Sequence, residues 1–387
     1  MALKGIKVLE LAGLAPAPLC GAILADFGAN VIRVDKHNQA MSLDAMSHGK
    51  RSISLNLKSP TGVKILRQMS KQSDVIIEPF RKGVMEKLGL GPEVLMKDNK
   101  RLIYARLTGY GQTGPLALKA GHDINYAAIS GVLSMLGRDN SPPTPPVNVL
   151  ADFAGGGLMC AFGIVMALLE RSKSGRGQVI DSSMVEGAAY VSSWLFRSQW
   201  LPIWGKGRGQ NSLDTGAHYY DTYETKDGGY MAVGSLEPQF YDQLLLGLGL
   251  TEEEAPQNVS DAKSEEMRQL LRVKFLSKTR AEWTEIFDQL DACVTPVLDM
   301  SEAADYSHNK ARGSFVIDKY GLPVPNPAPI LSLTPGVSQA ASKLRPEIGQ
   351  HTQDVLLEYG FSGEEIKGFV DEGVARICDS ENHPSKL

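Results

Sequence analysis

The stretch IKVLELAGLAPAPLCGAILADFGANVIRVD, residues 6–35, decides the fold class. It begins with an apolar run at 6–11, passes through the breaker-rich loop GLAPAP at 13–18, and shows helical spacing of apolar residues over 19–27. A second apolar run follows at 30–34. Apolar runs of strand length on either side of a helical pattern predict a βαβ unit.

The same alternation continues downstream. Residues 51–57 alternate between polar and apolar, 60–70 have helical spacing, and 74–78 and 101–107 are short apolar runs on either side of a helix at 84–88. Strands that alternate with helices predict an α/β fold with a largely parallel, Rossmann-like sheet. The first loop lacks the GxGxxG pattern, so binding of NAD or FAD is weakly supported, while a different nucleotide-bearing ligand stays open.

The second half of the chain predicts a second domain. An uncharged run at 153–169 is slightly short for a membrane span, so we expect a buried helix and no membrane span. A separate unit of about 215–305 shows two strands and two acidic helices, at 219–224, 230–233, 251–271 and 280–290. We expect a discontinuous large domain (1–190 and 310–365), a small α+β domain with its linkers (191–309), and a C-terminal tail (366–387).

Composition indicates a soluble globular protein. Of the 387 residues 43% are hydrophobic and 22% are charged, and the net charge of -4 argues against a nucleic-acid partner. The four cysteines form no CxxC pair and the seven histidines form no HxH or HExxH pattern, which predicts free thiols and no metal site. The apolar run at 6–11 leaves no room before it for a signal peptide.

The chain ends in Ser385, Lys386 and Leu387. This tripeptide matches the C-terminal signal that is read by the peroxisomal import receptor. The polar residues 379–384 would leave it accessible. We therefore expect that receptor as a partner and the peroxisome as the location.

Two motifs carry candidate chemistry: GHDINY at 121–126 and LADFAGGG at 150–157. Histidine exchanges protons readily near neutral pH, so His122 could act as an acid and a base. Asp152 precedes glycines at an expected helix start, where free N–H groups, those at Gly155 included, could hold an oxyanion. Read singly, His122 is better explained as a surface histidine in a turn, and Asp152 as a helix-capping aspartate. In one pocket they could move a proton off and back onto carbon.

Further motifs occur along the chain in the order of a known family. They are GA and VIRV at 28–29 and 31–34, GKRSI at 49–53, GLGP at 89–92, TGYGQTGP at 108–115 and GRGQ at 175–178. With 121–126 and 150–157 they resemble the family III CoA-transferases, and these last two motifs resemble the racemase members of that family. The likeness continues through EPQFY at 237–241 and DACVTPV at 291–297, and it covers nearly the whole chain.

The resemblance implies a fold and a reaction. Family members are interlocked homodimers with a Rossmann-like large domain, and the smaller domain of the partner closes over the site. The racemase members interconvert (2R)- and (2S)-2-methyl-branched acyl-CoA thioesters by 1,1-proton transfer through an enolate, in branched-chain fatty acid and bile acid metabolism. They are associated with peroxisomes and mitochondria. This chemistry needs no separate cofactor, because CoA is part of the substrate.

The resemblance also assigns residues. It makes His122 and Asp152 the two acid/base residues and Glu237 a supporting residue from the small domain. The CoA-contacting positions that it implies are Arg33, Lys36, Leu55, Asn56, Leu57, Lys58, Lys87, Ala120, Gly121, His122, Asp123, Ile124, Asn125 and Tyr126. The alternative is a CoA-transferase, in which Asp152 attacks the thioester and forms a mixed anhydride, a reaction that does not need His122. A third reading is a module that binds acyl-CoA without turnover.

Overall fold

The computed structural model describes residues 1–39 and 44–378, and the chain divides into two compact units. The large unit comprises 1–130, 146–191 and the described residues from 307 onward; the small unit comprises 131–145 and 192–306. Residues 131–145 were expected in the large domain but belong to the small unit. Residues 366–378 were expected in the tail but contribute a helix and a strand to the large unit. The C-terminal tripeptide lies outside the described residues.

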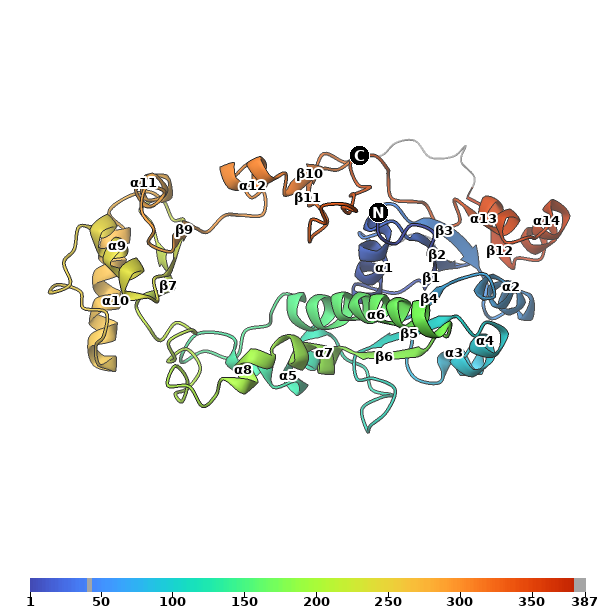
Figure 1. Ribbon diagram of the computed structural model, residues 1–387, viewed down its shortest axis with the longest axis horizontal. Coiled ribbons are helices and arrows are strands. Elements are labelled where there is room, and N and C mark those ends of the chain that lie inside the picture. The colour runs from blue at the N-terminus through green and yellow to red at the C-terminus, as the bar shows by residue number, and fades with distance from the viewer. Residues whose placement is uncertain (40–43, 379–387) are drawn as a thin grey trace. The chain divides into compact units, whose positions relative to one another are not determined.

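A seven-stranded sheet organises the large unit (Figure 1). Its strands in spatial order are β12 (Ala375–Arg376), β3 (Arg51–Leu55), β2 (Asn30–Lys36), β1 (Lys7–Leu11), β4 (Val75–Glu78), β5 (Ile103–Thr108) and β6 (Val179–Ser183). All neighbours pair in parallel except the edge strand β12. The predicted α/β fold with a largely parallel sheet is confirmed. The strand order reverses between β1 and β4, and in such sheets ligands bind beyond the carboxyl ends of the strands near this point.

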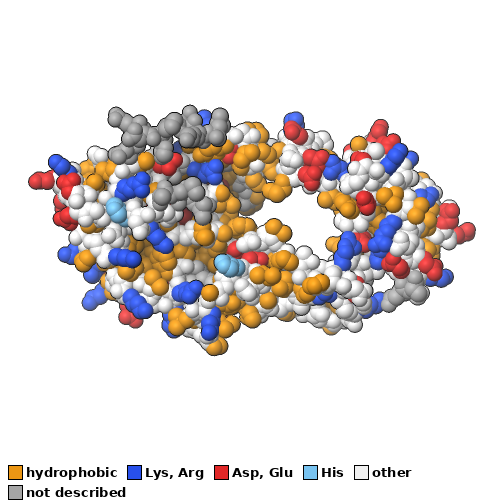
Figure 2. Space-filling view, turned by 180° about the vertical axis from the view of Figure 1, so that it is seen from behind, with side chains coloured by type: hydrophobic (Ala, Val, Ile, Leu, Met, Phe, Trp, Pro, Cys, Tyr) orange, Lys and Arg blue, Asp and Glu red, His pale blue; other side chains and the backbone are white. Residues whose placement is uncertain are grey.

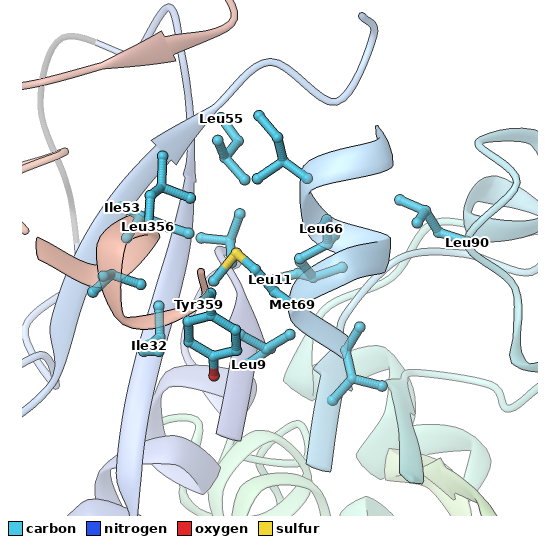
Figure 3. Packing of buried hydrophobic residues seen from close by; sticks show 14 of the residues in the cluster. Leu9, Leu11, Ile32, Ile53, Leu55, Leu66, Met69, Leu90, Leu356 and Tyr359 are labelled. Atoms are coloured by element: carbon cyan, nitrogen blue, oxygen red, sulfur yellow. The ribbon is translucent and has the colours of Figure 1, made fainter. Parts of the chain in front are cut away.

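One face of this sheet is covered by helices from both ends of the chain (Figure 3). Because side chains alternate along a strand, Leu9 and Leu11 of β1 both face this layer. They pack in one cluster with Leu66 of α2 (Pro60–Ser70) and Leu356 of α13 (Thr352–Glu358), and α14 (Gly363–Asp371) adds to it. The hydroxyl of Ser59 accepts a hydrogen bond from the backbone N–H of Thr61 and so caps α2, which starts at Pro60 as the sequence predicts.

The opposite face carries α1 (Pro16–Asp26) and α6 (Met159–Ser174). Here β1 contributes Glu10, which is fully buried and forms an ion pair of 2.8 Å with the buried Nζ of Lys50. Burial raises the pKa of Glu10 to about 7, while the charge of Lys50 lowers it. Gly21 of α1 leaves room for this pair, since a Cβ atom there would lie 1.7 Å from a carboxylate oxygen of Glu10.

The helix predicted at 153–169 is longer than expected and consists of a π-helical and an α-helical part. Residues Val149–Leu158 form a π-helix (η2) that continues directly into α6. By length and composition alone Val149–Ser174 could cross a membrane, and 44% of its most apolar window is buried within the chain. The expected burial holds for one face of the helix only: Ile164 and Ala167 are buried, whereas other apolar side chains are exposed in the single chain, namely Phe162, Val165, Met166 and Leu169.

The small unit has its own sheet and core. Antiparallel strands β7 (Tyr220–Glu224), β8 (Tyr230–Gly234) and β9 (Val294–Pro296) pack with α9 (Pro238–Leu248), α10 (Asp261–Phe275) and α11 (Arg280–Phe287). Both strands predicted for this unit are present. Helix α10 begins ten residues later than predicted: 251 was expected and Asp261 is observed. Pro256 lies in the intervening segment, and a proline disfavours helix in the residue before it.

Candidate active site

His122 lies at the start of α5 (Asp123–Ile129), with an exposed side chain. Its backbone N–H donates to Oδ1 of Asn125 at 3.0 Å, and this hydrogen bond caps the first turn of α5. The hydroxyl of Tyr126 donates to the carbonyl of Gly121 at 2.5 Å. These bonds fix the turn from which the imidazole projects.

Asp152 is the fourth residue of η2, and only 7% of it is exposed. The side-chain amide of Asn148 donates to Oδ2 of Asp152 at 2.8 Å. Burial raises the pKa of the Asp152 carboxyl; the Asn148 bond opposes this, the charge of Asp123 adds to it and the charge of His122 opposes it. Asp152 therefore holds a proton at higher pH than an ordinary aspartate does.

The two motifs are joined by Asp123. Its Oδ1 accepts hydrogen bonds from the backbone N–H groups of Ala151 at 2.8 Å and of Asp152 at 2.9 Å. Asp123 directly follows His122 in the chain and is 3% exposed. The buried carboxylate of Asp123 therefore connects the turn that carries His122 to the helix η2, which carries Asp152.

The glycines of the second motif have a packing role. Gly155 faces Gly187 of α7 (Met184–Val191), and a Cβ atom on Gly187 would lie 1.8 Å from the carbonyl oxygen of Gly155. The sequence suggested a helix start at Gly155, whose free N–H groups could hold an oxyanion, but the helix already starts at Val149. Gly155 lies inside η2, where N–H groups bond to carbonyls within the helix, as Phe153 does to Asn148.

A cavity of about 500 Å³ lies at the carboxyl ends of β1, β2 and β3. Five of the predicted CoA positions line it: Lys36, Leu55, Asn56, Leu57 and Lys58. Apolar side chains such as Val34 and Phe80 also line it. Figure 2 shows a face of the large unit, at the left, on which hydrophobic side chains gather between lysines and arginines. An apolar wall beside ammonium groups suits a base ring attached to phosphates.

The other predicted positions lie elsewhere. Arg33 does not line the cavity; it is 1% exposed, and its guanidinium pairs with Asp35 at 2.9 Å and Asp44 at 3.2 Å. Lys87 is exposed on α3 (Val84–Lys87), whose first residue lines the cavity. Glu237 is exposed and directly precedes α9 in the small unit.

The remaining positions surround the histidine. Ala120 is exposed in the loop before the turn, Ile124 is 43% exposed on α5, and Tyr126 is buried. Burial, with the charge of Asp152 as the next cause, raises the pKa of Tyr126 to about 12. Its ring fills the space over Gly109, where a Cβ atom would lie 2.1 Å from a ring carbon.

Residues 3–352 match CoA-transferase family III. The chain belongs to CoA-transferase family III. It is 57% identical to the alpha-methylacyl-CoA racemase of Mus musculus over 387 residues, which is the full length of both chains. It is 54% identical to the alpha-methylacyl-CoA racemase of Homo sapiens, with 95% of each chain covered. A CAIB/BAIF family protein from Brucella suis has the same fold, with a TM-score of 0.79 at 24% identity over 92% of this chain and 99% of that one.

Sequence reasoning missed several residues of this family III site. His37, Asn38 and Phe80 line the cavity, and Asn148 contacts Asp152. No helical spacing marks Asn148, because it precedes η2 and has a left-handed backbone with φ 63°. His37 and Asn38 follow a strand directly, at the sheet edge where ligands bind.

Within residues 1–39 and 44–378, no three His, Cys, Asp or Glu side chains are grouped as a metal ion would require.

Proposed function

We propose that the protein is an isomerase that interconverts (2R)- and (2S)-2-methyl-branched acyl-CoA thioesters. The observation that carries the proposal is the joining of the His122 and Asp152 motifs through Asp123, which gives one site two different acid/base groups. Identity of 57% and 54% to two racemases over nearly the whole chain supports the same reaction.

The proposed reaction is a 1,1-proton transfer. The hydrogen on the carbon beside a thioester carbonyl is weakly acidic, and the imidazole of His122 removes it from one face. The electron pair of the C–H bond moves into an enolate, with negative charge on the thioester oxygen. The protonated carboxyl of Asp152 then delivers a proton to the opposite face. In reverse, the carboxylate of Asp152 is the base and the imidazolium of His122 is the acid.

The upward-shifted pKa of Asp152 fits this double role. An ordinary aspartate is almost wholly ionised near neutral pH and is a poor proton donor there. Burial, the largest cause of the shift, increases the protonated fraction of Asp152. The same carboxyl can then donate in one direction and accept in the other.

Binding of the CoA part is proposed for the cavity beyond β1, β2 and β3. Lys36 and Lys58 would contact phosphate groups as point charges, while the apolar wall would contact the base ring. CoA is carried by the substrate, so the proposed scheme uses no separate cofactor.

Deuterium exchange tests the reaction. The protein is incubated with a (2R)-2-methylacyl-CoA in deuterated water, and deuterium at the α-carbon and the epimer ratio are measured. We expect both incorporation and epimerisation. Loss of general acid–base catalysis typically costs about 10²- to 10⁴-fold, so His122→Ala and Asp152→Asn should each lower racemisation within that range. His308→Ala, which alters another exposed histidine, is the matched control.

The alternatives give different results in the same assay. A CoA-transferase would show no incorporation but would transfer CoA to an added free acid. In that reaction the Asp152 carboxylate attacks the thioester carbon and the CoA thiolate leaves. A binding module would show neither. Full activity of either site variant would contradict the two-base assignment.

We propose that the protein acts as an interlocked homodimer, with Glu237 supplied to each site by the partner. Exposed apolar side chains on α6, Phe162, Val165, Met166 and Leu169, support contact with a second copy. Sedimentation velocity should then give about twice the chain mass of 41.9 kDa. A monomeric, active protein would contradict this proposal.

Location in peroxisomes, with a share in mitochondria, is also a proposal. It is supported by Ser385, Lys386 and Leu387 at the C-terminus. Removing the three residues from an N-terminally tagged protein should abolish its peroxisomal import. Unchanged import would contradict the role of the tripeptide, and cell fractionation would measure the mitochondrial share.

A further inference from the structure

The start of η2 depends on a group from outside the helix. The first N–H groups of a helix have no partner within it. Here two of them, from Ala151 and Asp152, donate to one oxygen of Asp123. A carboxylate that is 3% exposed is costly to bury without such donors. The two hydrogen bonds therefore give partners both to the first N–H groups of η2 and to the buried carboxylate of Asp123.

The backbone just before η2 is strained. Val147 has φ 52° and Asn148 has φ 63°, so two consecutive non-glycine residues are left-handed. This region is rare for a β-branched residue and persists only where the surroundings hold it. Asn148 is also the residue whose amide contacts Asp152. The carboxylate of Asp152 thus follows a strained turn, which a backbone hydrogen bond from Val149 to Pro146 closes, and Asp123 accepts the two N–H groups just after that turn.

We propose that Asp123 is a positioning residue of the reaction, which fixes Asp152 relative to His122 through the backbone and does not contact CoA through its carboxylate. This inference rests on the proposed racemase function. Asp123 is the first residue of α5, directly after His122, and it bonds to the N–H of Asp152 itself. Asp123 is thus linked to His122 by a peptide bond and to the backbone of Asp152 by a hydrogen bond, and no third residue takes part in this connection.

The reaction offers a readout that distinguishes positioning from stability. Inversion needs both bases at the same carbon, whereas His122 alone can remove a proton and return one to the same face. If Asp152 moves away, α-hydrogen exchange by His122 continues with retained configuration while inversion stops. Loss of folded protein would lower exchange and inversion by the same factor.

The test compares three variants of the full chain. Asp123→Ala removes the acceptor, and Asp123→Asn keeps an oxygen that can accept both N–H groups. Asp74→Ala is the matched control: Asp74 also accepts a backbone N–H, from Lys7 at 2.8 Å, but at the amino ends of the strands. Exchange, inversion, kcat and KM are measured with each epimer of a 2-methylacyl-CoA, together with thermal unfolding.

A displacement of about 1 Å can cost about 100-fold in rate, so Asp123→Ala should lower inversion by that order, with a much smaller effect on exchange from one epimer. Asp123→Asn should restore most of the inversion with an unchanged KM, and Asp74→Ala should leave the ratio of inversion to exchange unchanged.

Equal losses of exchange and inversion in Asp123→Ala would overturn the inference. A raised KM with unchanged kcat in Asp123→Asn would also overturn it, because that result would show that the carboxylate binds substrate. If Asp123→Ala does not fold, the kinetics of Asp123→Asn alone test the inference. A wild-type protein without exchange would instead refute the proposed function.

Discussion

Replacing Gly187 by alanine should disable the site without touching an acid/base residue. A Cβ atom on Gly187 would lie 1.8 Å from the carbonyl oxygen of Gly155 and 2.6 Å from its carbonyl carbon. Real Cβ contacts are essentially never closer than 3.0 Å, so α7 and η2 must separate by at least 3.0 − 1.8 = 1.2 Å. The contacted atoms are backbone, and no side-chain rotation can relieve the clash.

Two effects follow from this separation. Overpacking of this kind typically lowers the free energy of unfolding by about 1–3 kcal/mol. The carboxylate of Asp152 lies one turn from Gly155, so it should move with the helix. Misplacement by about 1 Å can cost about 100-fold in rate, and we expect kcat for racemisation to fall by that order.

The measurement is racemisation by the exchange assay, together with chemical unfolding of the same preparation. Gly163→Ala on α6 is the matched control, because its Cβ would meet only Ile180, at 3.4 Å, an ordinary contact. Alanine is favoured over glycine in a helix by up to about 1 kcal/mol, so this control should be as active as the wild type and no less stable. Wild-type kcat and stability in Gly187→Ala would refute the reasoning.

Three further variants test the charges of the large unit. Asn148→Ala removes a hydrogen bond that lowers the pKa of Asp152, so the pKa of this carboxyl should rise. In the reaction direction in which Asp152 is the base, the acid limb of the pH profile of kcat/KM should therefore shift to higher pH. A shift to lower pH would contradict this. Lys50→Met removes the partner of the buried Glu10 carboxyl, and breaking a buried ion pair typically costs about 3–5 kcal/mol of unfolding free energy. Because the charge of Lys50 lowers the pKa of Glu10, the variant should have a pKa above the wild-type value of about 7, so the loss should be small at acidic pH and should grow as the pH rises beyond 7; urea titrations that give equal losses at acidic and alkaline pH would argue against this. Lys36→Ala should raise the KM for acyl-CoA and weaken its salt dependence with little change in kcat, as steady-state kinetics at two ionic strengths would show.

Local patterns were sufficient for much of the fold. The helix Pro60–Ser70 was predicted from helical spacing with its observed bounds, and in the structure Ser59 caps its start. The strands β1, β2 and β4 are almost wholly buried, and their alternation with helices along the chain predicted the parallel sheet. Residues 55–58 and Lys36 line one cavity because the carboxyl ends of parallel strands meet at one edge of the sheet.

The sequence could not reveal the contacts that depend on distant segments. A π-helix at Val149–Leu158 and an α-helix share the same apolar composition, and the glycine contact with α7 joins residues 32 positions apart. Asp123 reads as a polar residue at a helix start, while its partners lie 28 and 29 positions away. Arg33 reads as a ligand-binding cation at a strand end, yet its guanidinium is buried against Asp35.

These contacts change the role of the glycine-rich segment in the proposed reaction. The N–H groups of Ala151 and Asp152 donate to Asp123, and Gly155 lies inside the helix, so in the proposed reaction the role of this segment is to hold Asp152 in place. Close packing by the glycines also buries Asp152, and burial is the largest cause of its raised pKa. This raised pKa increases the protonated fraction of the Asp152 carboxyl near neutral pH. A racemase must run in both directions on nearly isoenergetic epimers, so a carboxyl that can donate a proton as well as accept one favours both transfers.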